Sequence, residues 1–395
     1  MVVRSPIEKT AMTAYLAFFL SQVILSLTRR SNYAAIFLFL IINLWFVGLH
    51  YEVGFDWVLY KDQFEEFSRL QPGEFYSAFS FFQQFYGHET GFLILSFLAA
   101  HILPTFEFYY LAVFAFFLVS IISLARTMAS RNLIASFLFI HLFLLFTLEF
   151  STLRQIVAIS IFNIGLACFF NRRTYVAYSL MVSAAFFQVS ALIYLFAFLA
   201  SNRSNRKVLL YTAPVILFAV SLSFVSLLDV PFLTALGSMG VKLVWYFELR
   251  EERFSPNVFE QVFFAMLFCL LASWSFYSIR KKPGLSASNK TVAKMIFVMC
   301  LLALAFFGIN TIRNRIMYEI VILASLSAFV AETRLRSYLK TVLCGWGVVF
   351  LTVSLLKPSS FVYVPYQNYA IYEVFDLESD GQERQERLRH ELANR

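Results

Sequence analysis

The chain has 395 residues, of which 60% are hydrophobic and only 14% are charged, and its net charge is +8. With 49 phenylalanines and a mean hydropathy of +0.71, this composition excludes a soluble enzyme and indicates that lipid is the main solvent. The positive charge does not indicate nucleic-acid binding, because the basic residues lie in short connectors between apolar runs.

Apolar runs follow one another along the chain, and about 20 apolar residues are needed to cross about 30 Å of hydrocarbon. The expected spans are 10–28, 33–49, 106–125, 132–149, 154–170, 174–187, 188–200, 208–226, 258–279, 291–310, 314–331 and 338–356. These runs lack the alternation of barrel strands, so their backbone groups must be satisfied within helices. We predict one all-α polytopic domain over residues 1–356, with about 12 transmembrane helices.

The charged connectors predict the topology of these spans. The segments "TRRSN", "RTMASRN", "NRRT", "SNRSNRK", "RKKPGLSASNK" and "ETRLRSYLK" hold half of all lysines and arginines and one acidic residue, Glu332. By the positive-inside rule these loops are cytoplasmic. The large loops 50–105 and 227–257, both termini and a polar, solvated tail over 357–395 are then external, and we expect no catalytic role for the tail.

Two segments need a different interpretation to keep this topology consistent. The apolar stretch 91–103 is too short for a span and suits an interfacial or re-entrant helix. Residues 174–200 lie between two basic loops, so we predict a hairpin of two short helices with Gln188 and Ser190 near its tip. One long tilted helix is the alternative for this segment.

Three arginines lie at the external ends of predicted helices. Arg154 and Gln155 begin one span in "STLRQIVAISIF", and Arg313 and Arg315 begin another in "RNRIMYEIVI". A guanidinium fork at a helix N-terminus suits bidentate binding of phosphate, so three of them indicate a diphosphate. The alternatives are a lipid-facing anchor for Arg154 and an ion pair between Arg315 and Glu319, four residues apart.

The first external loop opens with "GLHYEVGFDWVLYKDQF", in which carboxylates alternate with aromatic residues. Glu52 and Asp56 can accept hydrogen bonds from sugar hydroxyls, while exposed rings such as Trp57 and Tyr60 can stack on apolar sugar faces. The stretch therefore suggests sugar recognition. A solvated acidic loop with interfacial aromatic residues is the alternative.

Other residue types suggest no cofactor and no metal site. The cysteines are widely spaced within apolar runs and are expected to be packing residues: Cys168, Cys269, Cys300 and Cys344. His141 lies in the middle of a predicted span, where a hydrogen-bonded core histidine is the expected reading.

Several motifs together resemble those of EpsG-type and Wzy-type polysaccharide polymerases. "GLHYEVGFDWVLY" resembles the signature G-x-R-x-x-x-G-x-D-x-x-x-Y, "ETGFLILSFL" the E-P-G-F stretch, and "STLRQIVAISIF" the arginine–glutamine helix start. "AAFFQVSALIYLF" resembles the F-H-x-S-A-L hairpin, and "RNRIMYEIVI" and "VYVPYQNY" resemble the late arginine helix and terminal P-Y. His50, Thr90 and Gln188 depart from the arginine, proline and histidine of these motifs.

The resemblance implies a GT-C-like polymerase of O-antigen or exopolysaccharide repeat units, in the inner membrane of a bacterium with its active face external. Its substrates would be oligosaccharides linked to undecaprenyl diphosphate, with membrane lipid around it and a chain-length regulator protein as a candidate partner. The expected roles follow from the matching positions and from the residues themselves. They are catalysis by Asp56 and Glu89, diphosphate binding by Arg154, Gln155, Arg313 and Arg315, and sugar binding by Glu52, Trp57 and Tyr60.

Three other functions compete with this reading. An O-antigen ligase would pass the glycan to a lipid acceptor, and the order of the motifs favours the polymerase. A flippase or another transporter is expected to have charges deep within several spans, whereas these spans are nearly free of charge at their centres. A membrane acyltransferase would rest on His141 alone.

Overall fold

The computed structural model describes residues 6–27, 33–85, 87–202, 213–214, 258–281, 286–306, 310–330, 334–356 and most of 362–390. Within these residues the chain is helical and contains no strand, apart from one isolated bridge between His50 and Asn368. The all-α fold class is therefore confirmed for the described part of the chain.

The helices follow the apolar runs closely. The N-terminal part contains α1 (Pro6–Ser26), α2 (Tyr33–Asn43), the π-helical turn η1 (Leu44–Gly48), α3 (Trp57–Arg69), the 3₁₀ turn η2 (Pro72–Glu74), α4 (Phe75–Phe85), α5 (Thr90–Ile102) and α6 (Phe106–Thr127). The middle contains α7 (Leu133–Leu144), the π-helical turn η3 (Leu145–Glu149), α8 (Leu153–Phe170), α9 (Thr174–Phe187) and α10 (Ala191–Ser201). The C-terminal part contains α14 (Val258–Lys281), α15 (Ala287–Ala305), α16 (Asn310–Ala328), α17 (Arg334–Leu356) and α18 (Tyr369–Phe375).

Every expected span except 208–226 coincides with one of these helices or with an α-helix continued by a π turn. The span 208–226, apart from two positions, lies outside the described residues, as does the loop 227–257 that was predicted to be external. Among the helices of the described residues, five contain a segment long and apolar enough to cross a membrane, judged by length and composition alone: α6, α8, α14, α15 and α17. The full number of about twelve spans remains a prediction.

Both unusual segments form the expected short elements. Residues 174–200 fold into the hairpin of α9 and α10, which meet at the buried Gln188. Residues 91–103 form most of α5, a 13-residue helix that packs against α3 and against α9. Gly91 makes this approach possible, because a Cβ atom there would lie 2.8 Å from the carbonyl oxygen of Phe186.

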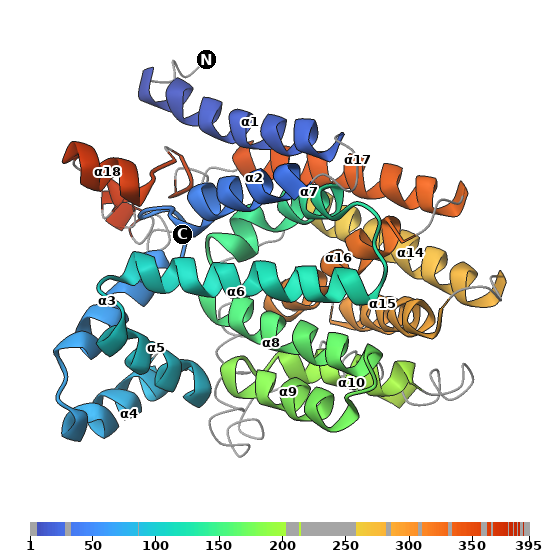
Figure 1. The fold of residues 1–395 in the computed structure, drawn as a ribbon, viewed down its shortest axis with the longest axis horizontal. Helices are drawn as coiled ribbons and strands as arrows, with labels where there is room; N and C mark the ends of the chain where they lie inside the picture. The colour runs from blue at the N-terminus through green and yellow to red at the C-terminus, as the bar shows by residue number, and fades with distance from the viewer. Residues whose placement is uncertain are drawn as a thin grey trace.

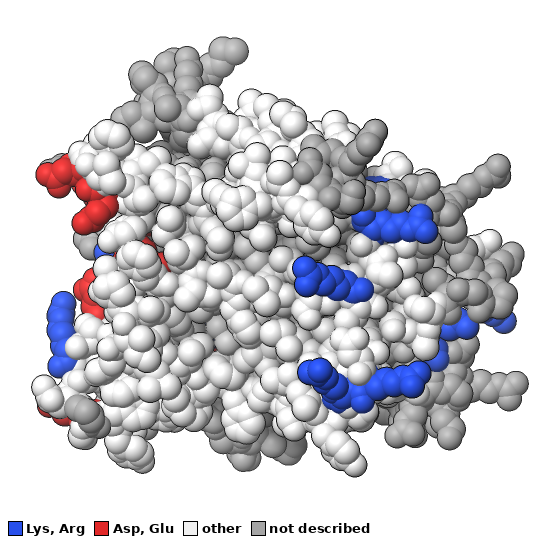
Figure 2. Space-filling view, viewed as in Figure 1, with Lys and Arg blue, Asp and Glu red and all other residues white. Residues whose placement is uncertain are grey.

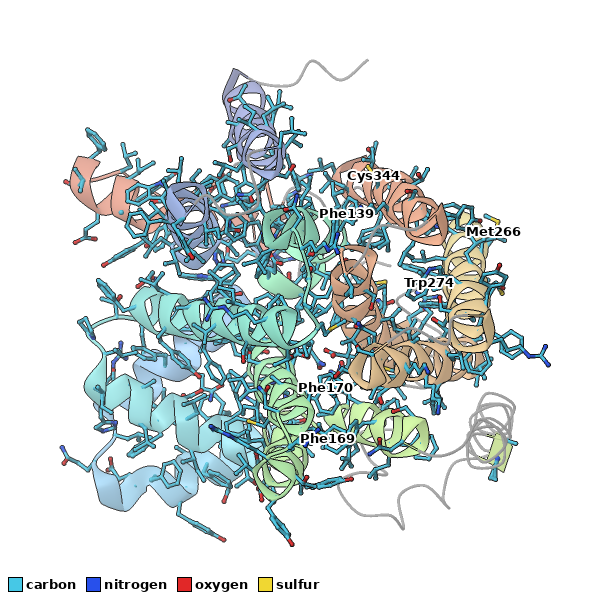
Figure 3. All side chains as sticks on the ribbon, turned by 45° about the vertical axis from the view of Figure 1, so that its right-hand side comes forward. Phe139, Phe169, Phe170, Met266, Trp274 and Cys344 are labelled. Atoms are coloured by element: carbon cyan, nitrogen blue, oxygen red, sulfur yellow. The ribbon has the colours of Figure 1, made fainter. Side chains whose placement is uncertain are left out.

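Helix α8 lies in the core of the bundle. It packs against α6 and α9, while α16 packs against α7 and α15 and buries nearly all of its length. Figure 1 shows the long helices lying side by side, with α3, α4 and α5 at the same end of the molecule as α18. Phe169, labelled in Figure 3, lies at the C-terminal end of α8, and its ring centroid is 4.8 Å from that of Phe198 in α10.

Charges separate along the long axis of the bundle. On the face drawn in Figure 2, the acidic side chains lie at the end of α3 and α18, and nearly all basic side chains lie toward the opposite end. The gathering of lysines and arginines toward one end is what the positive-inside rule predicts for the ends of helices that face the cytoplasm.

The C-terminal segment differs from the expected solvated tail, because it packs on the first large loop, which begins at residue 50. The N–H of Tyr51 donates to the carbonyl oxygen of Gln367 at 3.0 Å. Arg384 is only 7% exposed, and its guanidinium donates to the carbonyl oxygen of Glu52 at 3.4 Å. The prediction of a solvated tail is therefore wrong for these residues, since they supply hydrogen bonds that the loop backbone needs.

Candidate functional site

Asp56 lies where the first large loop, which begins at residue 50, meets α3. The loop reaches this point through a turn at Gly54, whose φ is +110° and whose absent side chain leaves room for the backbone of Phe150. A Cβ atom at Gly54 would lie 2.0 Å from the Phe150 carbonyl oxygen, so only glycine fits here. The N–H of Phe55 then donates to Oγ of Ser151 at 3.4 Å, which places Asp56 beside the start of α8.

Two opposing effects act on the pKa of the Asp56 carboxyl: burial of the group and the positive charges of two arginines. Burial raises its pKa from 3.8 to about 6, and the charges of Arg154 and Arg315 oppose this rise. Its side chain does not cap α3, although Asp56 occupies the N-cap position. A carboxylate with a pKa this close to neutral pH suits proton transfer, because it can both accept and release a proton under working conditions.

Arg154 is held in the first turn of α8 by three groups. Its Nε donates to the Tyr60 hydroxyl at 3.2 Å, and its Nη1 donates to the Gly87 carbonyl at 3.3 Å and to Glu89 Oε2 at 2.8 Å. The other oxygen of Glu89 faces the N–H of Val189 at 3.5 Å, in the tip of the α9–α10 hairpin. The side chain of Arg154 is only 16% exposed, which argues against a lipid-facing anchor.

Gln155 connects three helices rather than facing an open site. Its amide nitrogen donates to the Tyr194 hydroxyl at 2.6 Å, and its amide oxygen accepts from Ser190 at 3.0 Å. The Tyr194 hydroxyl donates to the backbone carbonyl of Arg315 at 2.5 Å. Gln155 is 2% exposed, so its position supports a structural connection from α8 through α10 to the start of α16.

The two arginines of α16 have different surroundings. Arg315 is partly exposed and acts electrostatically on Asp56, whereas Arg313 is 1% exposed and its guanidinium lies 4.6 Å from the ring centroid of Phe264 in α14. The structure therefore brings Arg315, and not Arg313, together with Asp56. Within the described part of the chain neither oxygen of Glu319 accepts a hydrogen bond, so the alternative Arg315–Glu319 ion pair is not formed.

The expected sugar-binding residues are less accessible than the loop sequence suggested. Trp57 is 1% exposed and Tyr60 is 4% exposed, so neither presents a free ring face. Glu52 is 5% exposed, accepts a hydrogen bond from Ser379 and lies 3.6 Å from the ammonium group of Lys61. The prediction of exposed rings is wrong at these two positions, because α3 turns them toward the core.

The sequence model of the EpsG family matches residues 32–368, which is most of the chain. The chain belongs to the EpsG family. This is a family of Wzy-like polymerases, so the chain is a glycosyltransferase-like polymerase in general terms. Neither the curated proteins nor the solved structures contain a match.

The matched range of this EpsG-family chain includes a buried pair that the sequence reading did not assign. His141 Nδ1 lies 2.7 Å from Glu149 Oε2, and both side chains are fully buried. The expectation of a hydrogen-bonded core histidine is thus confirmed, with Glu149 as the unexpected partner. The pair spans the π-helical turn η3, which immediately precedes the site residues Ser151 and Arg154.

Tyr363 is a second residue that the sequence reading missed in this EpsG-family chain. Its hydroxyl donates to the carbonyl of Phe146 at 2.9 Å and lies 3.2 Å from Oγ of Ser151. The C-terminal segment thereby fixes the corner between η3 and α8. The P-Y motif at Pro365 and Tyr366 was the only sequence signal close to this contact.

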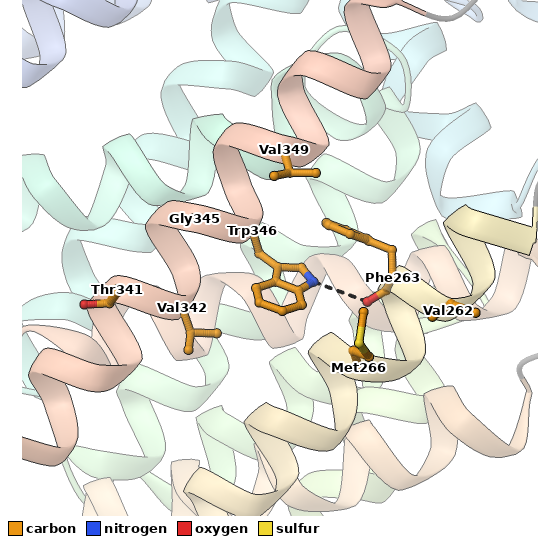
Figure 4. A pocket seen from close by; sticks show the side chains of 8 residues that line it. All are labelled: Val262, Phe263, Met266, Thr341, Val342, Gly345, Trp346 and Val349. Carbon is orange, nitrogen blue, oxygen red and sulfur yellow. Dashed lines mark hydrogen bonds between the residues drawn. The ribbon is translucent and has the colours of Figure 1, made fainter.

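An apolar groove lies between α14 and α17, as Figure 4 shows. Its volume is about 450 Å³, and the residues that line it are Val262, Phe263, Met266, Thr341, Val342, Gly345, Trp346 and Val349. The indole N–H of Trp346 donates to the carbonyl of Phe263 at 3.3 Å and so links α17 to α14 within the groove. The next residue, Phe264, is the one that contacts Arg313.

Proposed function

We propose that this protein joins oligosaccharide repeat units that are linked to undecaprenyl diphosphate, at the external face of a bacterial inner membrane. The product would be an O-antigen or an exopolysaccharide. The observation that supports this most directly is the partly buried Asp56 carboxyl in the field of Arg154 and Arg315. A carboxylate base and two guanidinium groups are what transfer of a sugar from a diphosphate requires.

In the proposed reaction, a hydroxyl of the acceptor sugar attacks the anomeric carbon of the donor glycan. The bond between that carbon and the diphosphate oxygen breaks, and the electron pair leaves with the diphosphate. The acceptor hydroxyl loses its proton to the carboxylate of Asp56. The donor bond is already activated, so the reaction needs no nucleotide sugar and no cofactor.

The arginines would stabilise the negative charge that develops on the leaving diphosphate. Arg154 is oriented before substrate binds, because Tyr60, Gly87 and Glu89 fix its guanidinium. Donors fixed in this way stabilise a transition state without reorganisation, and loss of one donor typically costs about 10²–10³-fold in rate. Since Glu89 is ion-paired to Arg154 at 2.8 Å, we assign Asp56 as the base and Glu89 as a positioning residue.

Positions away from this cluster suggest supporting roles. Arg315 is oriented through the bond from Tyr194 to its backbone, and Gln155 holds that tyrosine, so we infer a positioning role for Gln155. The separation of acidic and basic side chains along the bundle supports an external site, since the basic end would face the cytoplasm.

We propose that the apolar groove between α14 and α17 binds the isoprenoid chain of the carrier lipid. The groove is lined almost wholly by apolar side chains, which can hold an isoprenoid chain out of water. Arg313 is not among the residues that line it, because its guanidinium contacts the buried ring of Phe264. We therefore assign Arg313 no role in the groove.

A strain lacking this protein tests the proposed function. Gel analysis of its lipopolysaccharide or exopolysaccharide should show single repeat units and no long chains, and the wild-type gene should restore long chains while Asp56→Asn does not. Complete absence of repeat units on the acceptor would instead indicate a ligase or a flippase. Unchanged long chains would refute the polymerase.

A further inference from the structure

A second cavity lies beside the first external loop, separate from the Asp56 cluster. It has a volume of about 300 Å³, and its lining includes four residues of α3 together with Tyr51, Glu107 and Tyr369. We refer to it as the α3 pocket, because Lys61, Phe64, Glu65 and Ser68 all belong to that helix. Its volume lies at the lower end of the range for small-ligand pockets.

The lining of the α3 pocket combines charged and aromatic groups. The ammonium group of Lys61 lies 3.6 Å from Glu52 Oε1 and 5.4 Å from the ring centroid of Tyr51. Glu107 is 4% exposed, and its charge interacts with that of Lys61. The ring of Tyr369 lies 5.8 Å from that of Tyr51, and both tyrosines are partly exposed.

This chemistry selects among possible ligands. A lipid chain would leave the ammonium and the carboxylates without water or partners. A phosphate would meet Glu65 and Glu107 as well as Lys61, so like charges would oppose it. A sugar ring fits the lining, because its hydroxyl groups can donate to carboxylates and accept from an ammonium group. Its apolar face can pack on the partly exposed tyrosine rings.

We propose that the α3 pocket binds one sugar of the acceptor oligosaccharide, away from the bond that is formed. This inference rests on the proposed function, because it supplies a subsite for the same glycan. Helix α3 connects the two places: Tyr60 contacts Arg154, and Lys61 lines the pocket. Lys61 follows Asp56 by five residues, which corresponds to roughly 7.5 Å along a helix. A repeat unit of several sugars can therefore reach both sites.

A remote subsite of this kind should affect acceptor binding more than chemistry. Contacts that are equal in the ground state and the transition state lower KM and leave kcat unchanged. Tyr369→Ala removes the partly exposed ring while leaving the backbone hydrogen bond from the Tyr369 N–H to the Leu49 carbonyl in place. Tyr369→Phe keeps the ring and should behave like wild type.

The test uses the full-length protein in lipid nanodiscs with two acceptors, a complete lipid-linked repeat unit and a version truncated to its first sugar. Tyr369→Ala should raise KM for the complete acceptor about tenfold with little change in kcat, and should not affect the truncated acceptor. Tyr76→Ala is the matched control, because Tyr76 is 80% exposed and lies outside the pocket. Equal losses with both acceptors, or no loss with either, would overturn the subsite.

A binding measurement separates failure of the subsite from failure of the proposed function. The lipid-free repeat-unit oligosaccharide is added to wild-type protein and to Tyr369→Ala, and tryptophan fluorescence is followed, since Trp57 lies 5.1 Å from Lys61. Binding by wild type that Tyr369→Ala weakens supports the subsite even if no polymer forms. Absence of binding, or displacement of the oligosaccharide by inorganic phosphate alone, would overturn it.

Discussion

Replacement of Arg154 by lysine separates a diphosphate-binding arginine from a simple positive charge. The substitution keeps the charge but removes the planar fork, whose Nε and Nη1 atoms contact Tyr60, Gly87 and Glu89. A lysine ammonium can retain the ion pair to Glu89, but it lacks the Nη2 group, which the bonds of Nε and Nη1 hold in a fixed orientation for a diphosphate oxygen.

The structure sets the expected size of the effect. Loss of the Tyr60 hydrogen bond should lower the free energy of unfolding by about 0.5–1.5 kcal/mol, which leaves the protein folded. Loss of an oriented donor to the leaving group should lower kcat about 10²–10³-fold, or about 2.7–4 kcal/mol in the barrier. Activity should therefore fall far more than stability.

The assay compares polymer length in cells and initial rate in nanodiscs for Arg154→Lys, with membrane abundance measured alongside. Arg173→Lys is the matched control, because Arg173 is an exposed arginine at the start of α9. Normal chain length and rate for Arg154→Lys would refute the diphosphate-binding role and favour a purely electrostatic or structural one.

Three further predictions concern the base, the late arginines and the groove. Asp56→Asn should abolish polymerisation at normal abundance, and the wild-type rate should fall as pH drops through about 6, because the base must be ionised; a rate that is flat from about pH 5 to 8 would contradict this. Arg315→Lys should shorten the polymer more than Arg313→Lys in the same gel assay, since only Arg315 acts on Asp56; the reverse order would reassign them. Gly345→Leu should raise KM for the lipid-linked substrate, because a Cβ atom there meets no atom within 4 Å and the leucine side chain would fill the groove. Cys344 is exposed and does not line the groove, so an equal effect from Cys344→Leu would contradict lipid binding in the groove.

The sequence was sufficient to predict the helices and the main cluster. Apolar runs separated by basic connectors gave the helix positions, because lipid-exposed backbone leaves few other options. The charge rule also predicted the α9–α10 hairpin, which a length criterion alone would have merged into one helix. The matching motif positions assigned Asp56, Glu89 and Arg154 to one site. The structure pairs Arg154 with Glu89 and brings its charge to bear on Asp56, while the roles of the three residues remain predictions.

The remaining features depend on contacts that local patterns do not encode. Trp57 and Tyr60 were expected to be exposed, yet with Phe64 and Phe67 they form a stripe at helical spacing, which was the available signal for burial. The pair of His141 and Glu149 spans eight residues across a π-helical turn, so neither the i+3 nor the i+4 rule points to it. The packing of the C-terminal segment on η1 and on the first loop joins residues more than 300 positions apart and has no periodic signal.

The most direct test of the account is a reaction of the purified protein with a defined undecaprenyl-diphosphate-linked repeat unit in nanodiscs. Polymer length and released undecaprenyl diphosphate are measured together over time. Wild type should release one undecaprenyl diphosphate for each new glycosidic bond, and Asp56→Asn should release none. Polymer growth without release of the lipid diphosphate, or full activity of Asp56→Asn, would contradict the proposed chemistry.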